Sequence, residues 1–135
     1  MSHHVNEPHE CPACEEKLEE CHYLLAYWFE KLKHEFPDAH ISWGFRSKED
    51  QDEAFANHKS RLRWPMSKHN VMVKGKASSR AIDLFRLTDD YQAEFNPQWF
   101  KEVFEFLEDN EAPIVWGGSW KTFKDLCHFE LKPNA

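Results

Sequence analysis

Segment 78–85 reads SSRAIDLF, and this segment decides the expected fold. Polar and apolar side chains alternate along 79–87, which predicts a strand with Asp83 on one face and Ile82 and Leu84 on the other. A carboxylate between apolar neighbours is costly to bury unless it pairs with a charged group or binds a cation. Asp83 therefore marks both a central strand and a candidate site.

The segments around this strand predict a mixed helical and antiparallel architecture. An apolar stripe at three- and four-residue steps predicts one helix over 14–36, ended by Pro37. Ser47 and the Asn96-Pro97 pair predict two further helices, over 47–57 and 97–109. Short strands are expected at 40–45 and on both sides of the Gly117-Gly118 turn within 114–131, and 59–78 is expected to be a long loop. The fold class is α+β.

Composition limits the possible functions. The 135 residues fit a single domain over 1–135, with 1–12 expected to be a loosely ordered N-terminal segment. A formal net charge of -7 argues against binding to nucleic acid, and no apolar run is long enough for membrane insertion. The polar, His-rich start is unlike a signal peptide, so synthesis in the cytoplasm is expected. In that compartment the four cysteines are expected as thiols or metal ligands rather than disulfides.

Four polar residues could form a metal site with a catalytic base. His69 lies in the long loop, Asp83 lies mid-strand, and Asp125 and His128 form a D-x-x-H near the C-terminus. Two histidines and one carboxylate suit Zn²⁺ and leave a fourth position open for water. Asp125 is placed to accept that water's proton. The alternative is a loop histidine, a salt-bridged Asp83 and a surface Asp125.

Four blocks in this order carry a family resemblance. They are SWGFRSKEDQ (42–51), WPMSKHN (64–70), SSRAIDLF (78–85) and WGGSWKTFKDLCHFEL (116–131). Together they resemble the D-Ala-D-Ala carboxypeptidase and L-alanyl-D-glutamate endopeptidase family of zinc peptidases, which shares its fold with the hedgehog signalling domain and includes many phage endolysins. The resemblance implies a small antiparallel sheet with helices on one side and a zinc cleft on the other.

The resemblance also implies roles for individual residues. It places zinc on His69, Asp83 and His128, and the catalytic base on Asp125. Arg46 matches a position that contacts substrate or stabilises the oxyanion, although a structural salt bridge is the alternative. Substrate-contacting or ligand-supporting roles are expected for Gln51, Ser67 and Trp120.

Two departures from the family pattern stand out. His69 and Asp83 are 14 positions apart, further than in many relatives, so the intervening segment is interpreted as an insertion that reshapes one wall of the cleft. Ser119 stands where relatives often have Asp. Neither departure removes a predicted ligand.

The cysteines near the N-terminus form a second motif. Cys11, Cys14, Cys21 and His22 could hold a structural metal. Cys21, however, falls on the apolar stripe of the first predicted helix, and no βαβ pattern surrounds the C-x-x-C pair, so a redox pair is not predicted. Cys127 is expected in the core.

The resemblance and the site residues together predict a zinc peptidase that hydrolyses an amide in the peptide stem of peptidoglycan. It is expected to be a monomer and a phage or prophage lysis enzyme, which reaches the cell wall through a membrane pore or as part of a virion. The bond that is cut stays open between L-Ala–D-Glu and D-Ala–D-Ala. The alternative function is a non-catalytic, zinc-containing wall-binding or virion structural protein, or a metal-stabilised interaction domain.

Overall fold

The computed structural model describes residues 11–135. Its helices are α1 (Pro12–Leu18), α2 (Tyr23–Glu35), α3 (Lys48–Ala56) and α4 (Pro97–Asp109), with short 3-10 turns η2 (Lys68–Asn70) and η3 (Gly117–Ser119). Its strands are β1 (Ala39–Trp43), β2 (Met72–Val73), β3 (Lys76–Ala77), β4 (Ala81–Leu87), β5 (Ala93–Glu94), β6 (Ile114–Trp116) and β7 (His128–Leu131). No helix within this range is long and apolar enough to cross a bilayer.

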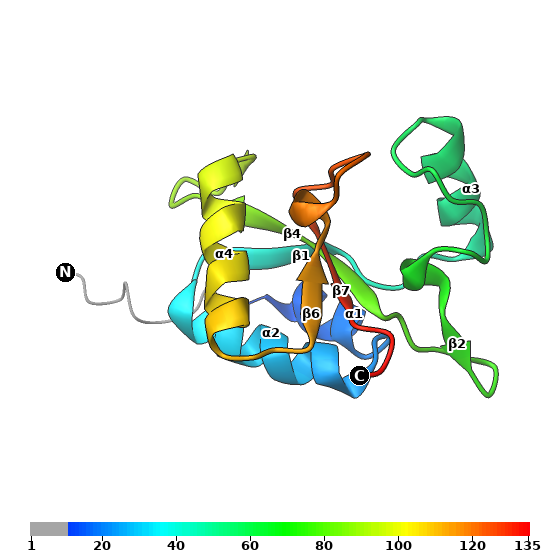
Figure 1. Ribbon diagram of the computed structural model, residues 1–135, viewed down its shortest axis with the longest axis horizontal. Helices are drawn as coiled ribbons and strands as arrows, with labels where there is room; N and C mark the ends of the chain where they lie inside the picture. The colour runs from blue at the N-terminus through cyan, green and yellow to red at the C-terminus, as the bar shows by residue number, and fades with distance from the viewer. Residues whose placement is uncertain (1–10) are drawn as a thin grey trace.

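An antiparallel sheet organises the molecule, and the α+β prediction is confirmed. The strand order is β1-β4-β7-β6, with β5 paired to the far end of β4. Helices α2 and α4 pack on the sheet, whereas α3 lies apart from them at the other end of the molecule (Figure 1). Sheet side chains on the helix-covered face, such as Leu84 and Phe129, pack with helix side chains, such as Leu25 and Phe100, in one apolar core.

The predicted helix over 14–36 is wrong in one respect, because the chain forms two helices instead of one. Helix α1 ends at Leu18, and Cys21 forms an isolated bridge with Ser79. The His22 N–H donates to the Ser79 carbonyl at 2.8 Å, and its side chain then caps α2. These contacts with a distant segment replace the helical hydrogen bonds that the stripe predicted.

Local capping signals predicted the other helices well. Ser47 caps α3 by accepting a hydrogen bond from the Asp50 N–H, and Asn96 caps α4 from the Trp99 N–H. The region expected to be a loop is more ordered than predicted, because it contains η2 and the β2–β3 hairpin.

The start of the described chain corrects the expectation for one pair of cysteines. The segment expected to be loosely ordered, 1–12, lies outside the described residues except for Cys11 and Pro12, which form the N-cap and first residue of α1, and the expectation for the segment stays a prediction. Cys11 and Cys14 are joined by a disulfide, so the expectation of four unpaired cysteines is wrong for this pair. The two sulfurs meet because a helix brings residues three apart onto the same face. Cys21 and Cys127 are free.

Candidate metal centre and cleft

The sheet itself brings two candidate ligands together. Asp83 of β4 and His128 of β7 are direct partners in the antiparallel ladder. Their neighbours Ile82 and Phe129 belong to the core, so Asp83 and His128 point to the opposite face. Both are nevertheless buried, at 4% and 6% exposure, because a loop covers them.

That loop delivers His69 from η2. The Ser67 hydroxyl accepts a hydrogen bond from the His69 N–H at 3.1 Å, and the Ser67 N–H donates to Asn70 Oδ1 at 3.1 Å. The His69 carbonyl accepts from the Arg46 N–H at 2.9 Å. This reciprocal cap and the backbone bond to 46 fix the turn, so His69 is held against the sheet although it lies in a connecting segment.

The three side chains form a compact triangle of donor atoms. His69 Nε2 lies 3.2 Å from Asp83 Oδ1 and 3.3 Å from His128 Nδ1, and His128 Nδ1 lies 3.1 Å from Asp83 Oδ1. Ligand atoms at about 2.1 Å from a tetrahedral ion lie about 3.4 Å from one another. The triangle therefore has the dimensions of one face of a tetrahedral zinc site.

The remaining ring nitrogens explain why a cation fits this triangle. His69 Nδ1–H donates to the Gly44 carbonyl at 2.7 Å, and His128 Nε2–H donates to Glu130 Oε1 at 2.8 Å. With those protons committed, neutral His69 and His128 both turn lone pairs toward the Asp83 carboxylate. Three converging acceptors repel one another unless a positive charge lies between them.

The pKa values of Asp83 and His128 are also shifted by their mutual contacts. Burial alone would raise the pKa of Asp83, but His69 and His128 outweigh it and hold that pKa far below its usual range. Burial lowers the pKa of His128, yet hydrogen bonds to Asp83 and Glu130 outweigh burial and raise it to about 9. A proton and a metal ion therefore compete for the same lone pair on His128.

Arg46 borders the triangle on its other side. Its Nη2 donates to Asp83 Oδ2 at 3.1 Å, and both side chains are buried. This bond occupies the second carboxylate oxygen and leaves Oδ1 directed at the histidines. Arg46 Nε is buried without a hydrogen-bond partner within residues 11–135, and the side chain lines the adjoining cleft.

Asp125 lies at the edge of the triangle, on the segment between η3 and β7. Burial and the nearby Asp83 charge raise its pKa. Its N–H donates to the Gly117 carbonyl at 3.1 Å, and a Cβ at Gly117 would lie 2.4 Å from the Asp125 carbonyl oxygen. Glycine is therefore required at 117 for Asp125 to approach the centre. Cys127 packs against the core as expected, but its thiol also donates to Asp125 Oδ1 at 3.3 Å.

A cleft of about 510 Å³ opens beside the triangle. Asp125, His69 and His128 lie on its wall, together with a group of basic side chains. The basic group is Arg46, Lys59, Arg61 and Lys68. Although the chain carries a formal net charge of -7, these four basic side chains outnumber the acidic Asp125 and Glu130 on the cleft wall, which favours an anionic ligand.

The other predicted residues lie at or near this cleft. Gln51 is fully buried, where its Nε2 donates to the Leu62 carbonyl at 2.7 Å and its Oε1 accepts from Asn70 at 3.2 Å. It thus ties α3 to both ends of the 59–70 loop. The centroid of the Trp120 ring lies 5.2 Å from that of the His128 ring, and Trp120 lines the cleft. Ser67 also lines the cleft, and its side chain caps η2.

The segment predicted to be an insertion lies elsewhere. The described residues that line the cleft do not include Met72–Ala77, which form the β2–β3 hairpin at the edge of the molecule (Figure 1). The hairpin is therefore not part of the wall of this cavity, and the broader prediction that the insertion reshapes the cleft stays a prediction. The 59–62 segment forms that wall instead, because Gln51 holds it there.

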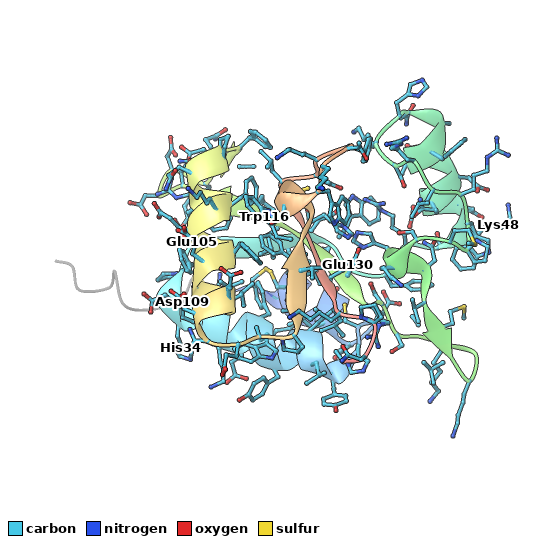
Figure 2. All side chains as sticks on the ribbon, in the orientation of Figure 1. His34, Lys48, Glu105, Asp109, Trp116 and Glu130 are labelled. Carbon is cyan, nitrogen blue, oxygen red and sulfur yellow. A yellow bond between two sulfur atoms is a disulfide. The ribbon has the colours of Figure 1, made fainter. Side chains whose placement is uncertain are left out.

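Three supporting groups were missed from the sequence. Glu130 lies two residues beyond His128 on β7 (Figure 2), and strand alternation would have placed it on the same face. Asn70 follows Ser67 by three residues, which is a capping-box spacing. The Gly44 carbonyl carries no side-chain signal, so no sequence pattern could have indicated it.

The possible second metal set is not assembled as the sequence suggested. Cys11 and Cys14 form a disulfide, Cys21 donates to the Lys17 carbonyl at 3.3 Å, and the His22 ring caps α2. Cys21 is also held in its thiol form, because burial and Glu20 raise its pKa to about 12. These four residues therefore do not share a centre.

Comparisons with known proteins agree with this geometry. A family model described as D-alanyl-D-alanine carboxypeptidase matches residues 63–131, just over half of the chain and including His69, Asp83, Asp125 and His128. The crystal structure of Serratia marcescens L-Ala D-Glu endopeptidase ChiX superposes with a TM-score of 0.75 at 21% identity, covering 96% of this chain and 94% of that one. None of the curated proteins compared with the chain matches it by sequence. The fold is thus that of a known peptidase structure, and the chain belongs to the D-alanyl-D-alanine carboxypeptidase family of peptidases.

Proposed function

We propose that this protein is a zinc-dependent peptidase that hydrolyses an amide bond in the peptide stem of bacterial peptidoglycan. The observation that carries the proposal is the convergence of His69 Nε2, His128 Nδ1 and Asp83 Oδ1 beside a cleft that contains the half-buried Asp125. The second ring nitrogen of each histidine is already hydrogen-bonded. The family match and the likeness to an endopeptidase support the substrate class.

His69, Asp83 and His128 would hold the ion. A bound zinc ion would supply Lewis-acid chemistry, which polarises a scissile carbonyl and acidifies water. The Gly44 carbonyl and Glu130 orient the two imidazoles, and Arg46 orients the Asp83 carboxylate. The protein's own contribution is thus a ligand set fixed before any substrate arrives.

Asp125 would transfer the proton. It takes a proton from the attacking water and gives it to the leaving amine, for which a raised pKa is favourable because the group must both accept and release the proton near neutral pH. Arg46 would add a fixed positive charge near the developing oxyanion. The basic cleft lining would attract the carboxylates of a stem peptide.

An active-site substitution tests the catalytic part of the proposal. Asp125→Asn should lower the rate of clearing of cell-wall suspensions by roughly 10²- to 10⁴-fold while zinc content stays at one ion per chain. Asp109→Asn, on the exposed end of α4, is the matched control and should clear walls normally. Undiminished clearing by Asp125→Asn would favour a non-catalytic wall-binding role.

Two finer points belong to the same proposal. We infer an L-alanyl-D-glutamate endopeptidase or a D-Ala-D-Ala carboxypeptidase, and mass spectrometry of digested muropeptides separates them by the fragment released. We also infer a monomeric phage or prophage lysis enzyme that acts after passage through a membrane pore or on a virion. Expression in bacteria with and without a pore-forming partner tests this, since lysis should require the pore.

A further inference from the structure

The Cys11–Cys14 disulfide lies at the start of α1, on residues outside the metal cleft. Its two sulfurs differ in access, because Cys14 is 1% exposed and belongs to the core, whereas Cys11 is half-buried. A thiol in solution therefore reaches Cys11 Sγ first. Attack at Cys11 makes Cys14 the leaving group.

The surroundings of Cys14 suit a leaving thiolate. The Ile41 N–H of β1 donates to Cys14 Sγ at 3.3 Å, and His40 Nδ1 lies 3.8 Å from the same sulfur. Lys33 Nζ lies 3.4 Å from the other ring nitrogen of His40. An ammonium group can only donate, so a neutral His40 beside it carries its proton on Nδ1, toward Cys14.

Cys11 also has a donor for its sulfur. The Cys14 N–H lies 3.0 Å from Cys11 Sγ, so each sulfur of the pair faces a backbone N–H group. Hydrogen bonds to an ionised group are stronger than bonds to a neutral one, and donors of this kind stabilise a thiolate more than a disulfide sulfur. The contacts therefore favour the reduced pair more than an apolar environment would.

We propose that Cys11 and Cys14 form a reversible redox site that small monothiols open and close, rather than a permanent cross-link. A monothiolate such as that of glutathione attacks Cys11 Sγ, the Cys11–Cys14 bond breaks, and its electron pair remains on Cys14 Sγ. A second monothiolate then attacks the outer sulfur of the mixed disulfide and releases Cys11 as a thiolate. Overall, two monothiols are oxidised to one disulfide, and the protein gains two electrons and two protons.

This site would couple redox state to the stability of the N-terminal region. The bond closes a short loop, and its loss should lower the melting temperature by about 6 °C. Cys14 also contacts β1, the strand that leads to Gly44. The proposal extends to residues that the peptidase mechanism does not use, so it stands or falls separately from the proposed function.

The test counts thiols in the zinc-loaded full chain after equilibration with glutathione buffers. Alkylation under denaturing conditions should report two thiols in the oxidised protein and four after incubation with about 5 mM reduced glutathione. His40→Gln should require about fivefold more reduced glutathione for half-reduction, because the N–H donor toward Cys14 is altered. His34→Gln, an exposed histidine on α2, is the matched control (Figure 2) and should titrate as the unmodified protein.

A trapping experiment identifies the attacked sulfur. Cys14→Ser should accumulate a glutathionyl group on Cys11 when exposed to oxidised glutathione, whereas Cys11→Ser should react far more slowly at the buried Cys14. Two thiols after a day in reduced glutathione would show a permanent cross-link and overturn the proposal. So would equal titrations of the two histidine variants, or faster labelling of Cys14 than of Cys11.

Discussion

Replacing Glu130 by leucine should weaken zinc binding by about 50-fold without unfolding the protein. The carboxylate accepts the His128 Nε2–H bond at 2.8 Å, and both groups are largely shielded from water. Loss of such a supporting bond costs roughly 10- to 100-fold in metal affinity. Because the hydrogen bond is short and largely shielded from water, we expect a loss of about 50-fold. This loss corresponds to about 2.3 kcal/mol of zinc-binding free energy.

A graded series separates charge from hydrogen bonding. Glu130→Gln retains an oxygen that can accept the His128 proton but removes the negative charge. Since neutral hydrogen bonds have about half the strength of charge-assisted ones, this variant should lose only about sevenfold in affinity. Glu105→Leu, an exposed position on α4, is the control and should bind zinc normally.

The assay is competition for zinc with a chromophoric chelator at fixed pH, with circular dichroism as a check on folding. Catalytic rate is not used as the measure, because Glu130 also lines the cleft. If folded Glu130→Leu bound zinc within twofold of the unmodified protein, His128 would not bind through Nδ1. The ligand assignment would then need revision.

Three further variants probe the surroundings of the centre. Gly117→Ala should lower the hydrolysis rate about 100-fold with zinc retained, because the new Cβ would displace the Asp125 carbonyl. An unchanged rate would show that catalysis does not require Asp125 to lie close to the metal site. Burial lowers the pKa of Lys33 to about 8 in the folded protein, from 10.5 in the unfolded chain. Below pH 8 the buried Lys33 ammonium therefore destabilises the folded state, and this destabilisation disappears as the pH rises toward 10.5. The stability of the protein relative to Lys33→Met should therefore rise by about 1.5 kcal/mol between pH 8 and 10.5 in urea unfolding, because solvent screening reduces the full effect of the shift by about half. Parallel pH curves would contradict this. Gln51→Leu should cost about 2 kcal/mol of unfolding free energy and speed proteolysis within 59–70, whereas a change below about 0.5 kcal/mol would mean that the loop is held by other contacts.

Local signals in the sequence predicted most of the frame. Each N-cap hydrogen bond, from Ser47 or Asn96, joins residues only three positions apart, and both helices begin where these two residues predicted. Asp83 was conspicuous because a carboxylate inside an apolar strand needs a partner, and the structure provides His69, His128 and Arg46. Such features are predictable since cause and effect lie in one segment.

Features that depend on distant contacts were not predictable in this way. The break between α1 and α2 requires Ser79, which lies far along the chain from His22. The path of 59–70 depends on Gln51, whose bonding groups could not be paired with the Leu62 carbonyl from spacing alone. The state of Cys11 and Cys14 was inferred from the expected compartment, which says nothing about the distance between two sulfurs.

The pairing of Asp83 with His128 across β4 and β7 has a consequence for how this scaffold can vary. Two of the three proposed ligands are set by strand register, and a shift of β7 by one residue would turn His128 away from Asp83 and His69. Connecting segments, by contrast, can lengthen or shorten without disturbing that pair, as the β2–β3 hairpin illustrates. Connecting segments can therefore change while the relative placement of Asp83 and His128 stays fixed by the backbone ladder.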